Sequence, residues 1–185
     1  MGKTFKNKQN PFVPALAHSI TRHLPTLRHT HPVLAGSDAE LALRPLYTDT
    51  ALPVAALVNL LPKDTYFIGA TNLGGESWVT EILKTQANRK LQVFGVDLKQ
   101  TPKVTGLVDD FSSAVLIWPV ACKRSNPELF KVLASIEDEC RARVQTILSL
   151  VDMQQGTRES LEKRDYTFRA VIKAEKLGFP VHTWV

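Results

Sequence analysis

Short apolar segments alternate with amphipathic helical segments over most of the chain, and this alternation limits the possible folds more than any other feature. Four apolar runs are predicted to form strands, at residues 66–70, 91–96, 114–120 and 146–151. The third run, Ala-Val-Leu-Ile-Trp-Pro-Val, is apolar enough to lie buried on both faces of a sheet. Strands that alternate with helices indicate a parallel sheet with right-handed crossovers. The sequence therefore predicts an α/β fold with a mainly parallel, twisted sheet flanked by helices.

Four helices are predicted before or between these strands. Prolines mark the ends of helices at residues 15–24 and 53–61, and apolar residues four apart mark a third helix at residues 76–86. A longer helix begins at Asn126-Pro127, where a capping residue precedes a proline in the first turn, and extends to residue 143. In a parallel sheet of this kind, ligands bind beyond the carboxyl ends of the strands.

The size and composition of the chain suit a single soluble domain. It has 185 residues, which is an ordinary length for one domain. It contains no run of 18 apolar residues and no apolar core near its amino end, so we expect neither a membrane span nor a secretory signal. Cys122 and Cys140 lack the spacing of a redox or zinc pair and are expected to be free thiols. Free thiols favour a cytoplasmic location, and we expect no metal site.

The net charge of +5 is concentrated at the amino end of the chain. No acidic residue precedes Asp38, and the rest of the chain is formally neutral. We therefore predict two parts, a basic N-terminal arm with a short helix at residues 1–36 and an α/β domain at residues 37–185. A cationic arm on a neutral body can contact a polyanion such as nucleic acid, or it can be a solvated tail. The five cations of this arm are Lys3, Lys6, Lys8, Arg22 and Arg28.

The segment Leu148–Lys163 resembles the C-terminal signature of orotate phosphoribosyltransferases, in which an apolar strand runs into Val-Asp-Arg-Gln-Glu-Gly-Gly and a turn of helix. Leu46-Tyr47-Thr48-Asp49 is similar to the family's Phe-Tyr-Ile-Asp element. Ile68–Gly75 looks like the family's strand and pyrophosphate loop, and Ala114–Ile117 looks like the strand that leads into the phosphoribosyl-pyrophosphate site. The resemblance covers about residues 37–178 and implies a type I phosphoribosyltransferase fold.

The resemblance also implies that some ligand-binding positions persist. The pyrophosphate loop falls on Thr71–Gly75, where two glycines let the backbone approach an anion closely, although a plain strand-to-helix turn explains them equally well. The phosphate loop falls before the helix that starts at Pro127. Its cations, Lys123 and Arg124, either hold a phosphate or another anion there or are simply solvated. The residues expected to bind a ligand are Thr71, Asn72, Gly74, Gly75, Lys99, Lys123, Arg124, Ser125 and Asn126.

The residues that the family uses for catalysis are missing. The family has paired carboxylates for the ribose hydroxyls after the third strand, but this chain has Trp118-Pro119, and neither side chain can accept a hydrogen bond. Met153 stands where the family has the arginine that holds orotate. The mobile catalytic loop falls on residues 93–101, and Lys99 is its only cation. We therefore predict no catalytic residue.

An alternative alignment places the acidic pair at Asp109-Asp110. A helix should follow such a motif directly, whereas the most strand-like run of the chain follows here. The preceding segment, residues 103–106, also makes a poor buried strand. We therefore place Asp109 and Asp110 on a turn between two strands. The possibility that they are a displaced active-site pair stays open.

These observations favour a non-catalytic phosphoribosyltransferase-like protein that binds a partner or serves as a scaffold. It is expected to form a homo-oligomer or part of a larger assembly and to need no cofactor. The alternative is an active orotate phosphoribosyltransferase that makes orotidine monophosphate from orotate and phosphoribosyl pyrophosphate with Mg²⁺. A third hypothesis, based on the basic arm, is a protein that binds nucleic acid.

Overall fold

The structure, a computed structural model, describes residues 10–22, 46–72, 75–98, 102–106, 113–121, 127–140 and 142–177. Its α-helices are α1 (Val13–Arg22), α3 (Ala51–Val58), α4 (Glu76–Thr85), α5 (Pro127–Cys140) and α6 (Thr157–Glu162). Its 3-10 helices are η1 (Ala87–Arg89) and η2 (Ala174–Leu177). Its strands are β1 (Phe67–Thr71), β2 (Gln92–Asp97), β3 (Lys103–Thr105), β4 (Ser113–Ile117), β5 (Val120–Ala121), β6 (Arg143–Asp152) and β7 (Thr167–Lys173).

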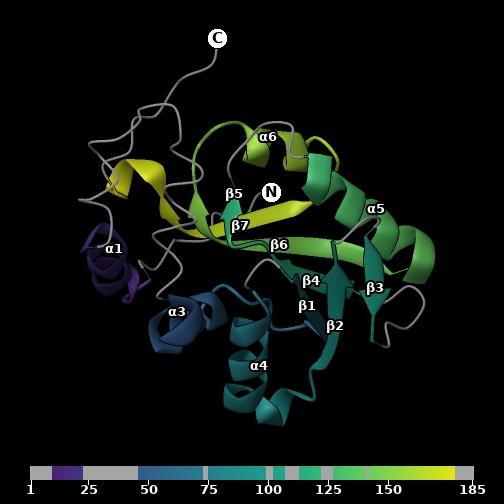
Figure 1. Cartoon of the computed structure of the whole chain (residues 1–185), viewed down its shortest axis with the longest axis horizontal. Coiled ribbons are helices and arrows are strands. Elements are labelled where there is room, and N and C mark those ends of the chain that lie inside the picture. The colour runs from purple at the N-terminus through teal and green to yellow at the C-terminus, as the bar shows by residue number, and fades with distance from the viewer. Residues whose placement is uncertain are drawn as a thin grey trace, which may run out of the picture.

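All seven strands belong to one sheet, whose centre is parallel (Figure 1). The order is β3-β2-β1-β4-β6-β7, and β5 pairs with β6 on the same side as β4. Every pairing is parallel except that of β2 with the short edge strand β3. The predicted α/β fold with a mainly parallel sheet is therefore confirmed.

Helices cover both faces of the sheet and divide the core in two. On one face, buried side chains of α1, α3, α4 and η2 form a single apolar cluster with the sheet. On the other face, α5 and Leu161 of α6 form a second cluster. The strand β4 serves both clusters, because Val115 and Ile117 belong to the first and Ala114 and Leu116 to the second. This alternation follows from the two-residue repeat of a strand, and it explains why the run is apolar throughout.

The predicted third strand, residues 114–120, is not continuous. It ends at Ile117 and resumes as β5 at Val120, and both parts pair with β6 in succession. Pro119 interrupts the strand because proline has no N–H group to donate to a neighbouring strand. Its carbonyl instead accepts hydrogen bonds from the amides of both Leu150 (3.0 Å) and Val151 (3.2 Å). The predicted third strand therefore consists of two short strands, β4 and β5, which pair with the same edge of β6 on either side of Trp118-Pro119.

Other element boundaries differ modestly from the sequence analysis. The helix predicted at residues 127–143 ends at Cys140, and the last predicted strand begins three residues early, at Arg143. The segment at residues 103–106 contains the edge strand β3 (Lys103–Thr105), whose residues are exposed or half-buried. The strand β7 was not predicted.

The helix α1 packs into the core of the α/β body. Leu16 and Ile20 are fully buried, and the amide group of Asn10, just before the helix, donates a hydrogen bond to the Ala56 carbonyl of α3 (2.9 Å). The predicted division at residue 36 stays a prediction, because residues 23–45 lie outside the described ranges. Of the five cations of the predicted arm, only Arg22 is described.

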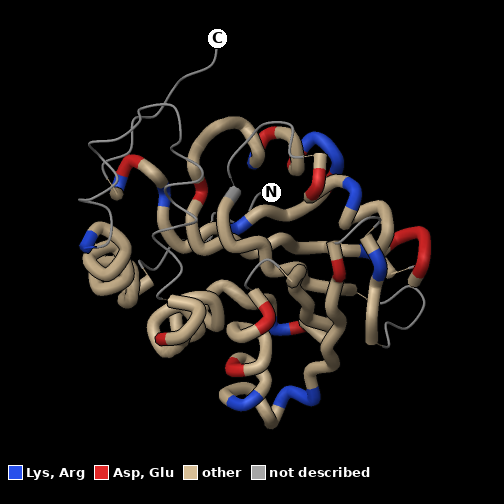
Figure 2. The backbone as a smooth tube through the Cα atoms, in the orientation of Figure 1, with Lys and Arg blue, Asp and Glu red and all other residues tan. Residues whose placement is uncertain are grey.

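Two further findings concern the surface. Along the described body, basic and acidic residues are interspersed rather than gathered on one face (Figure 2). No helix within the described ranges is both long enough and apolar enough to cross a bilayer.

Candidate functional site

The carboxyl ends of β1 and β2 hold a small polar cluster. The side-chain amide of Asn72 donates a hydrogen bond to Asp97 (2.9 Å), and its oxygen accepts one from the Leu98 amide (3.4 Å). The Asn72 backbone amide donates to the Val96 carbonyl (3.2 Å). Asn72 was predicted to bind a ligand, but its side chain links the ends of two adjacent strands through these hydrogen bonds.

Thr71, the last residue of β1, is fully buried, and its hydroxyl has no hydrogen-bond partner within the described part of the chain. The same holds for the buried hydroxyl of Ser77 in the first turn of α4. A buried hydroxyl without a partner costs about 1–3 kcal/mol. Among the described residues that were predicted to bind a ligand, Thr71 therefore has a buried and unpaired hydroxyl.

Gly75 lies between β1 and α4 and has a packing role. A Cβ at this position would come within 2.8 Å of the Ala70 Cβ, so the close approach of helix and strand requires glycine. The start of α4 offers free backbone N–H groups, which attract anions, but Glu76 adds a negative charge in the first turn. The negative charge of Glu76 therefore weakens the attraction of this helix start for an anion.

The joint between β4 and β5 presents no ligand-binding group. Trp118 is only 5% exposed and belongs to the core cluster on the side of α5. The carbonyl of Pro119 accepts hydrogen bonds from two β6 amides and from the Ser149 hydroxyl (3.1 Å). The position to which the sequence resemblance assigns the paired carboxylates is therefore part of the packed interior.

The end of β6 is also structural. Met153 is 1% exposed and lies in the core cluster on the side of α3 and α4. The preceding carboxylate, Asp152, is 2% exposed; it accepts a hydrogen bond from the Gln154 amide (2.8 Å) and pairs with Arg158 (3.4 Å). Met153 therefore does not present a group to the carboxyl edge of the sheet.

Several predicted site residues lie outside the described ranges, namely Gly74, Lys99, Lys123, Arg124, Ser125 and Asn126. Asp109 and Asp110 lie outside them as well, but the residues on either side are described. A Cβ on Gly106 would approach the Val93 carbonyl near the start of β2, and Ser113 opens β4 opposite Arg143, the first residue of β6. The chain thus leaves β3 and enters β4 at the amino edge of the parallel strands, whereas Thr71 and Gly75 lie at the carboxyl edge.

The described residues do not fit a dedicated Mg²⁺ site. No group of three or more His, Cys, Asp or Glu side chains comes together within the described ranges. Asp97 is hydrogen-bonded to Asn72, and Asp152 is paired with Arg158. Since Mg²⁺ requires several oxygen ligands in near-octahedral geometry, we derive no chemical step through it.

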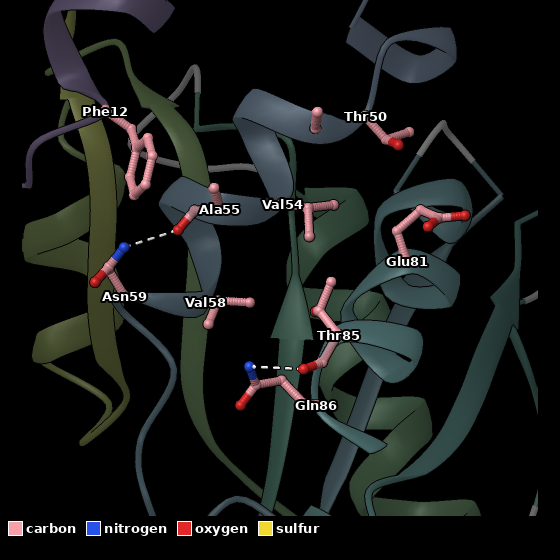
Figure 3. A pocket seen from close by; sticks show the side chains of 10 residues that line it. Phe12, Thr50, Val54, Ala55, Val58, Asn59, Glu81, Thr85 and Gln86 are labelled. Carbon is pink, nitrogen blue, oxygen red and sulfur yellow. Dashed lines mark hydrogen bonds between the residues drawn. The ribbon is translucent and has the colours of Figure 1, made fainter. Parts of the chain in front are cut away.

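A pocket of about 540 Å³ lies elsewhere, between Phe12, α3 and α4 (Figure 3). The sequence analysis did not predict it. One sequence feature could have indicated it. The segment Ala51–Val58 has no polar residue, and a helix that is apolar all round is normally covered on every side.

The sheet order and the helices on both faces match the type I phosphoribosyltransferase fold. Orotate phosphoribosyltransferases are among the solved structures that share it. The enzyme from Mycobacterium tuberculosis H37Rv, in complex with phosphoribosyl pyrophosphate, superposes with a TM-score of 0.70 at 18% identity, over 91% of this chain and 99% of that one.

Two further structures support the same conclusion. An orotate phosphoribosyltransferase from Aeropyrum pernix gives a TM-score of 0.61 at 20% identity, over 75% of this chain and 82% of that one. A phosphoribosyltransferase from Corynebacterium diphtheriae gives 0.64 at 15% identity, over 90% and 98%. By sequence, no protein-family model and no curated protein matches the chain. At such low identities, the structural likeness establishes the fold and confirms that part of the sequence-based resemblance.

Proposed function

We propose that this chain is a non-catalytic phosphoribosyltransferase-like protein that binds a partner or serves as a scaffold. The observation that carries the proposal is the burial of Trp118 at the end of β4. Phosphoribosyl transfer develops positive charge on a ribose whose hydroxyls need acceptors, and an indole offers only a donor. At 5% exposure, this indole contributes to the core and leaves almost no surface for a sugar.

A second substitution acts in the same direction at the end of β6. Met153 is buried among apolar residues, and a thioether cannot make the charge-assisted contacts by which an arginine holds a carboxylate. Loss of one preorganised electrostatic contact typically lowers an enzyme's rate by about 10²–10³. Loss of two such groups, even if their effects are not additive, leaves little turnover.

A combined thermal-shift and turnover assay tests this proposal. The full chain is incubated with phosphoribosyl pyrophosphate, Mg²⁺ and orotate, beside the M. tuberculosis enzyme as a positive control. We expect no orotidine monophosphate above a heat-inactivated sample. A rise in the melting temperature without turnover would identify a ligand-sensing protein, since a ligand that binds only the folded state stabilises it. Sustained turnover would refute the proposal.

We infer that the protein acts in an assembly, as a homo-oligomer or with other proteins, in the cytoplasm. The support is the resemblance to a family that often forms homodimers. In addition, the chain has the fold of that family, while Trp118 and Met153 are buried in its core. Size-exclusion chromatography with light scattering measures the assembly directly. A strict monomer that captures no partner in a pull-down would contradict this inference.

An active orotate phosphoribosyltransferase is the second candidate, favoured by one observation. The fold matches that of the M. tuberculosis enzyme over 91% of this chain, and an intact site can lie on residues that the sequence alignment misplaces. This candidate predicts consumption of orotate and phosphoribosyl pyrophosphate that depends on Mg²⁺. Absence of turnover above the heat-inactivated sample would eliminate it.

Binding of nucleic acid through the basic arm is a separate possibility that rests on charge alone. Lys3, Lys6, Lys8, Arg22 and Arg28 precede the first acidic residue of the chain. Such binding would weaken steeply with salt, because phosphate contacts release counterions. The informative variant changes the first three lysines to Gln and leaves α1 intact, since Leu16 and Ile20 of that helix are fully buried. Unchanged binding of nucleic acid by this variant would show that the arm is not responsible.

A further inference from the structure

The outer edge of β3 makes a contact that the proposed function does not explain. The strand pairs with β2 and with no other described strand, so it forms one edge of the sheet, beside the last turn of α5 (Figure 1). Lys103 and Thr105 are exposed, and Val104 is half-buried. The unpaired N–H and C=O groups of an exposed edge can pair with a strand of another molecule, and this is a common route to association.

The middle residue of β3 directs its backbone N–H away from the sheet. The Val104 amide donates a hydrogen bond to the Glu139 carboxylate at the end of α5 (3.3 Å). In an antiparallel pair, successive residues alternate between facing the partner strand and facing away from it. Lys103 and Thr105 therefore direct their N–H groups toward β2. Within β3, the outward N–H that another strand would need is the one that Glu139 already accepts.

The acceptor of this hydrogen bond stands where a helix disfavours a carboxylate. The last turn of α5 contains Glu137, Asp138 and Glu139 and no basic residue, although the partial negative charge of a helix C-terminus favours cations. Glu137 accepts a hydrogen bond from the Tyr166 hydroxyl (2.9 Å), which accounts for one of these acids. The contact with Val104 accounts for a second.

We propose that Glu139 blocks the outer edge of β3 and thereby prevents a second copy of this chain from pairing with it, strand to strand. A carboxylate accepts a hydrogen bond from an amide more strongly than a neutral carbonyl does, so the carbonyl of an incoming strand is the weaker competitor. The edge is otherwise self-complementary. Two copies of β3 on a twofold axis, with Val104 opposite Val104, would place Lys103 opposite Thr105 and so avoid a like-charge pair.

This inference does not depend on the proposed function. It implies that any homo-oligomer of the native chain uses a surface other than the β3 edge. In the twofold arrangement described above, both hydrogen bonds between the two strands would use the Val104 N–H. A variant that lacks the Glu139 acceptor should therefore associate, and a variant that also lacks this N–H should not.

Light scattering of the full-length chain over a range of protein concentrations tests the proposal. Glu139→Ala removes the acceptor and frees the Val104 N–H. We expect the mass of this variant to rise with concentration to at least about twice that of the wild type, because each freed edge can pair with one further copy. Glu139→Gln keeps an oxygen acceptor at the same position and should stay close to the wild-type mass.

Two further variants separate the edge from other causes of association. Asp138→Ala removes the same charge from a neighbouring exposed residue of α5 and should leave the mass unchanged. Glu139→Ala combined with Val104→Pro removes the acceptor and the outward N–H together, and a sheet edge tolerates proline where the N–H faces outward. This double variant should return to the wild-type mass. Circular dichroism checks that each variant is folded.

Three results would overturn the proposal. An unchanged mass for Glu139→Ala at every concentration would show that its carboxylate blocks nothing. Equal association of Asp138→Ala would assign the effect to net charge, and association of the double variant would assign it to another surface. If Val104→Pro does not fold, Glu139→Ala and Glu139→Gln decide, and equal behaviour of these two contradicts the proposal. None of these results affects the proposed function, because the turnover assay does not involve β3.

Discussion

The residue that most affects our account is Trp118, whose indole fills the core beside α5. We expect Trp118→Ala to lower the free energy of unfolding by about 3–5 kcal/mol, as for other large-to-small changes at buried aromatic positions. Trp118→Phe keeps most of the buried area and should cost clearly less. Urea denaturation measures both. If Trp118→Ala cost less than about 1 kcal/mol, the indole would not be a packed part of the interior.

Gly75 offers a second test at the residue scale. Because a Cβ there would lie 2.8 Å from the Ala70 Cβ, Gly75→Ala should destabilise the protein by about 1–3 kcal/mol through overpacking. The matched variant Gly75→Ala with Ala70→Gly removes the colliding atom. It should recover part of the loss relative to the sum of the two single changes. Strict additivity in a thermodynamic cycle would contradict a direct clash.

Tyr166 predicts a pH dependence of stability. Burial, together with a hydrogen bond to the Glu137 carboxylate (2.9 Å) and the negative charge of that group, raises the pKa of the Tyr166 phenol to about 12. Between pH 10, its ordinary value, and about pH 12, the unfolded chain loses this proton while the folded chain keeps it. The stabilisation is therefore fully present below pH 10 and is lost as the pH rises to 12.

The measurement is urea denaturation at several alkaline pH values, with Tyr166→Phe as the comparison. The variant should show a shallower loss of stability between pH 10 and 12. Because lysines also titrate in this range, only the difference between the two proteins is informative. Parallel stability curves would show that the phenol does not titrate differently in the folded state.

At the scale of elements, Arg158 joins the end of β6 to α6 and β7. It pairs with Asp152 and Glu162, donates to the Phe168 carbonyl (3.2 Å) and lies over the Phe168 ring at 4.9 Å. We expect Arg158→Ala to cost about 2 kcal/mol, which is less than for a fully buried pair because the guanidinium side chain is 33% exposed.

The control for this prediction is Arg164→Ala, which removes a guanidinium over the Phe130 ring (4.2 Å) without affecting Asp152. It should cost less than 1 kcal/mol, in the range of an exposed cation–π contact. Thermal or urea denaturation distinguishes the two. Equal effects would mean that the buried Asp152 carboxylate does not depend on Arg158.

Elements with strong local patterns could be predicted from the sequence, and those fixed by long-range pairing could not. The central strands and α4 and α5 have continuous apolar runs or helical periodicity, so their positions were found to within a few residues. The strand β3 has only three residues, which are exposed or half-buried, so its pairing with β2 leaves almost no apolar signal. The strand β7 mixes exposed and buried positions irregularly, and β6 is its only partner among the described strands.

The candidate site could likewise be predicted only in part from the sequence. That Trp118 and Met153 replace functional groups stays a prediction from the sequence resemblance, because it depends on residue type and alignment alone. The sequence could not indicate that both side chains are buried, that Asn72 links two strands, or that Gly75 is required by Ala70, because these facts arise from contacts between distant segments. Asp109 and Asp110 stay predicted to lie on a turn.

For the whole molecule, the fold places weaker demands on the sequence than a catalytic site does. The frame needs apolar residues of suitable size at alternating positions, which many sequences supply, and it persists at 18% identity to the M. tuberculosis enzyme. A catalytic site needs particular groups at particular points. At the two positions that we propose as former site positions, Trp118 and Met153 are buried in the core.

Single-turnover kinetics decides whether the chain transfers a phosphoribosyl group. The chain is mixed in excess over phosphoribosyl pyrophosphate with Mg²⁺ and orotate, and pyrophosphate release is followed over time. This format detects even one slow event per molecule and does not depend on product release. We predict release no faster than in the absence of the chain. Orotate-dependent release above that background would contradict the conclusion that the end of β4 is a filled structural joint rather than a sugar-binding site.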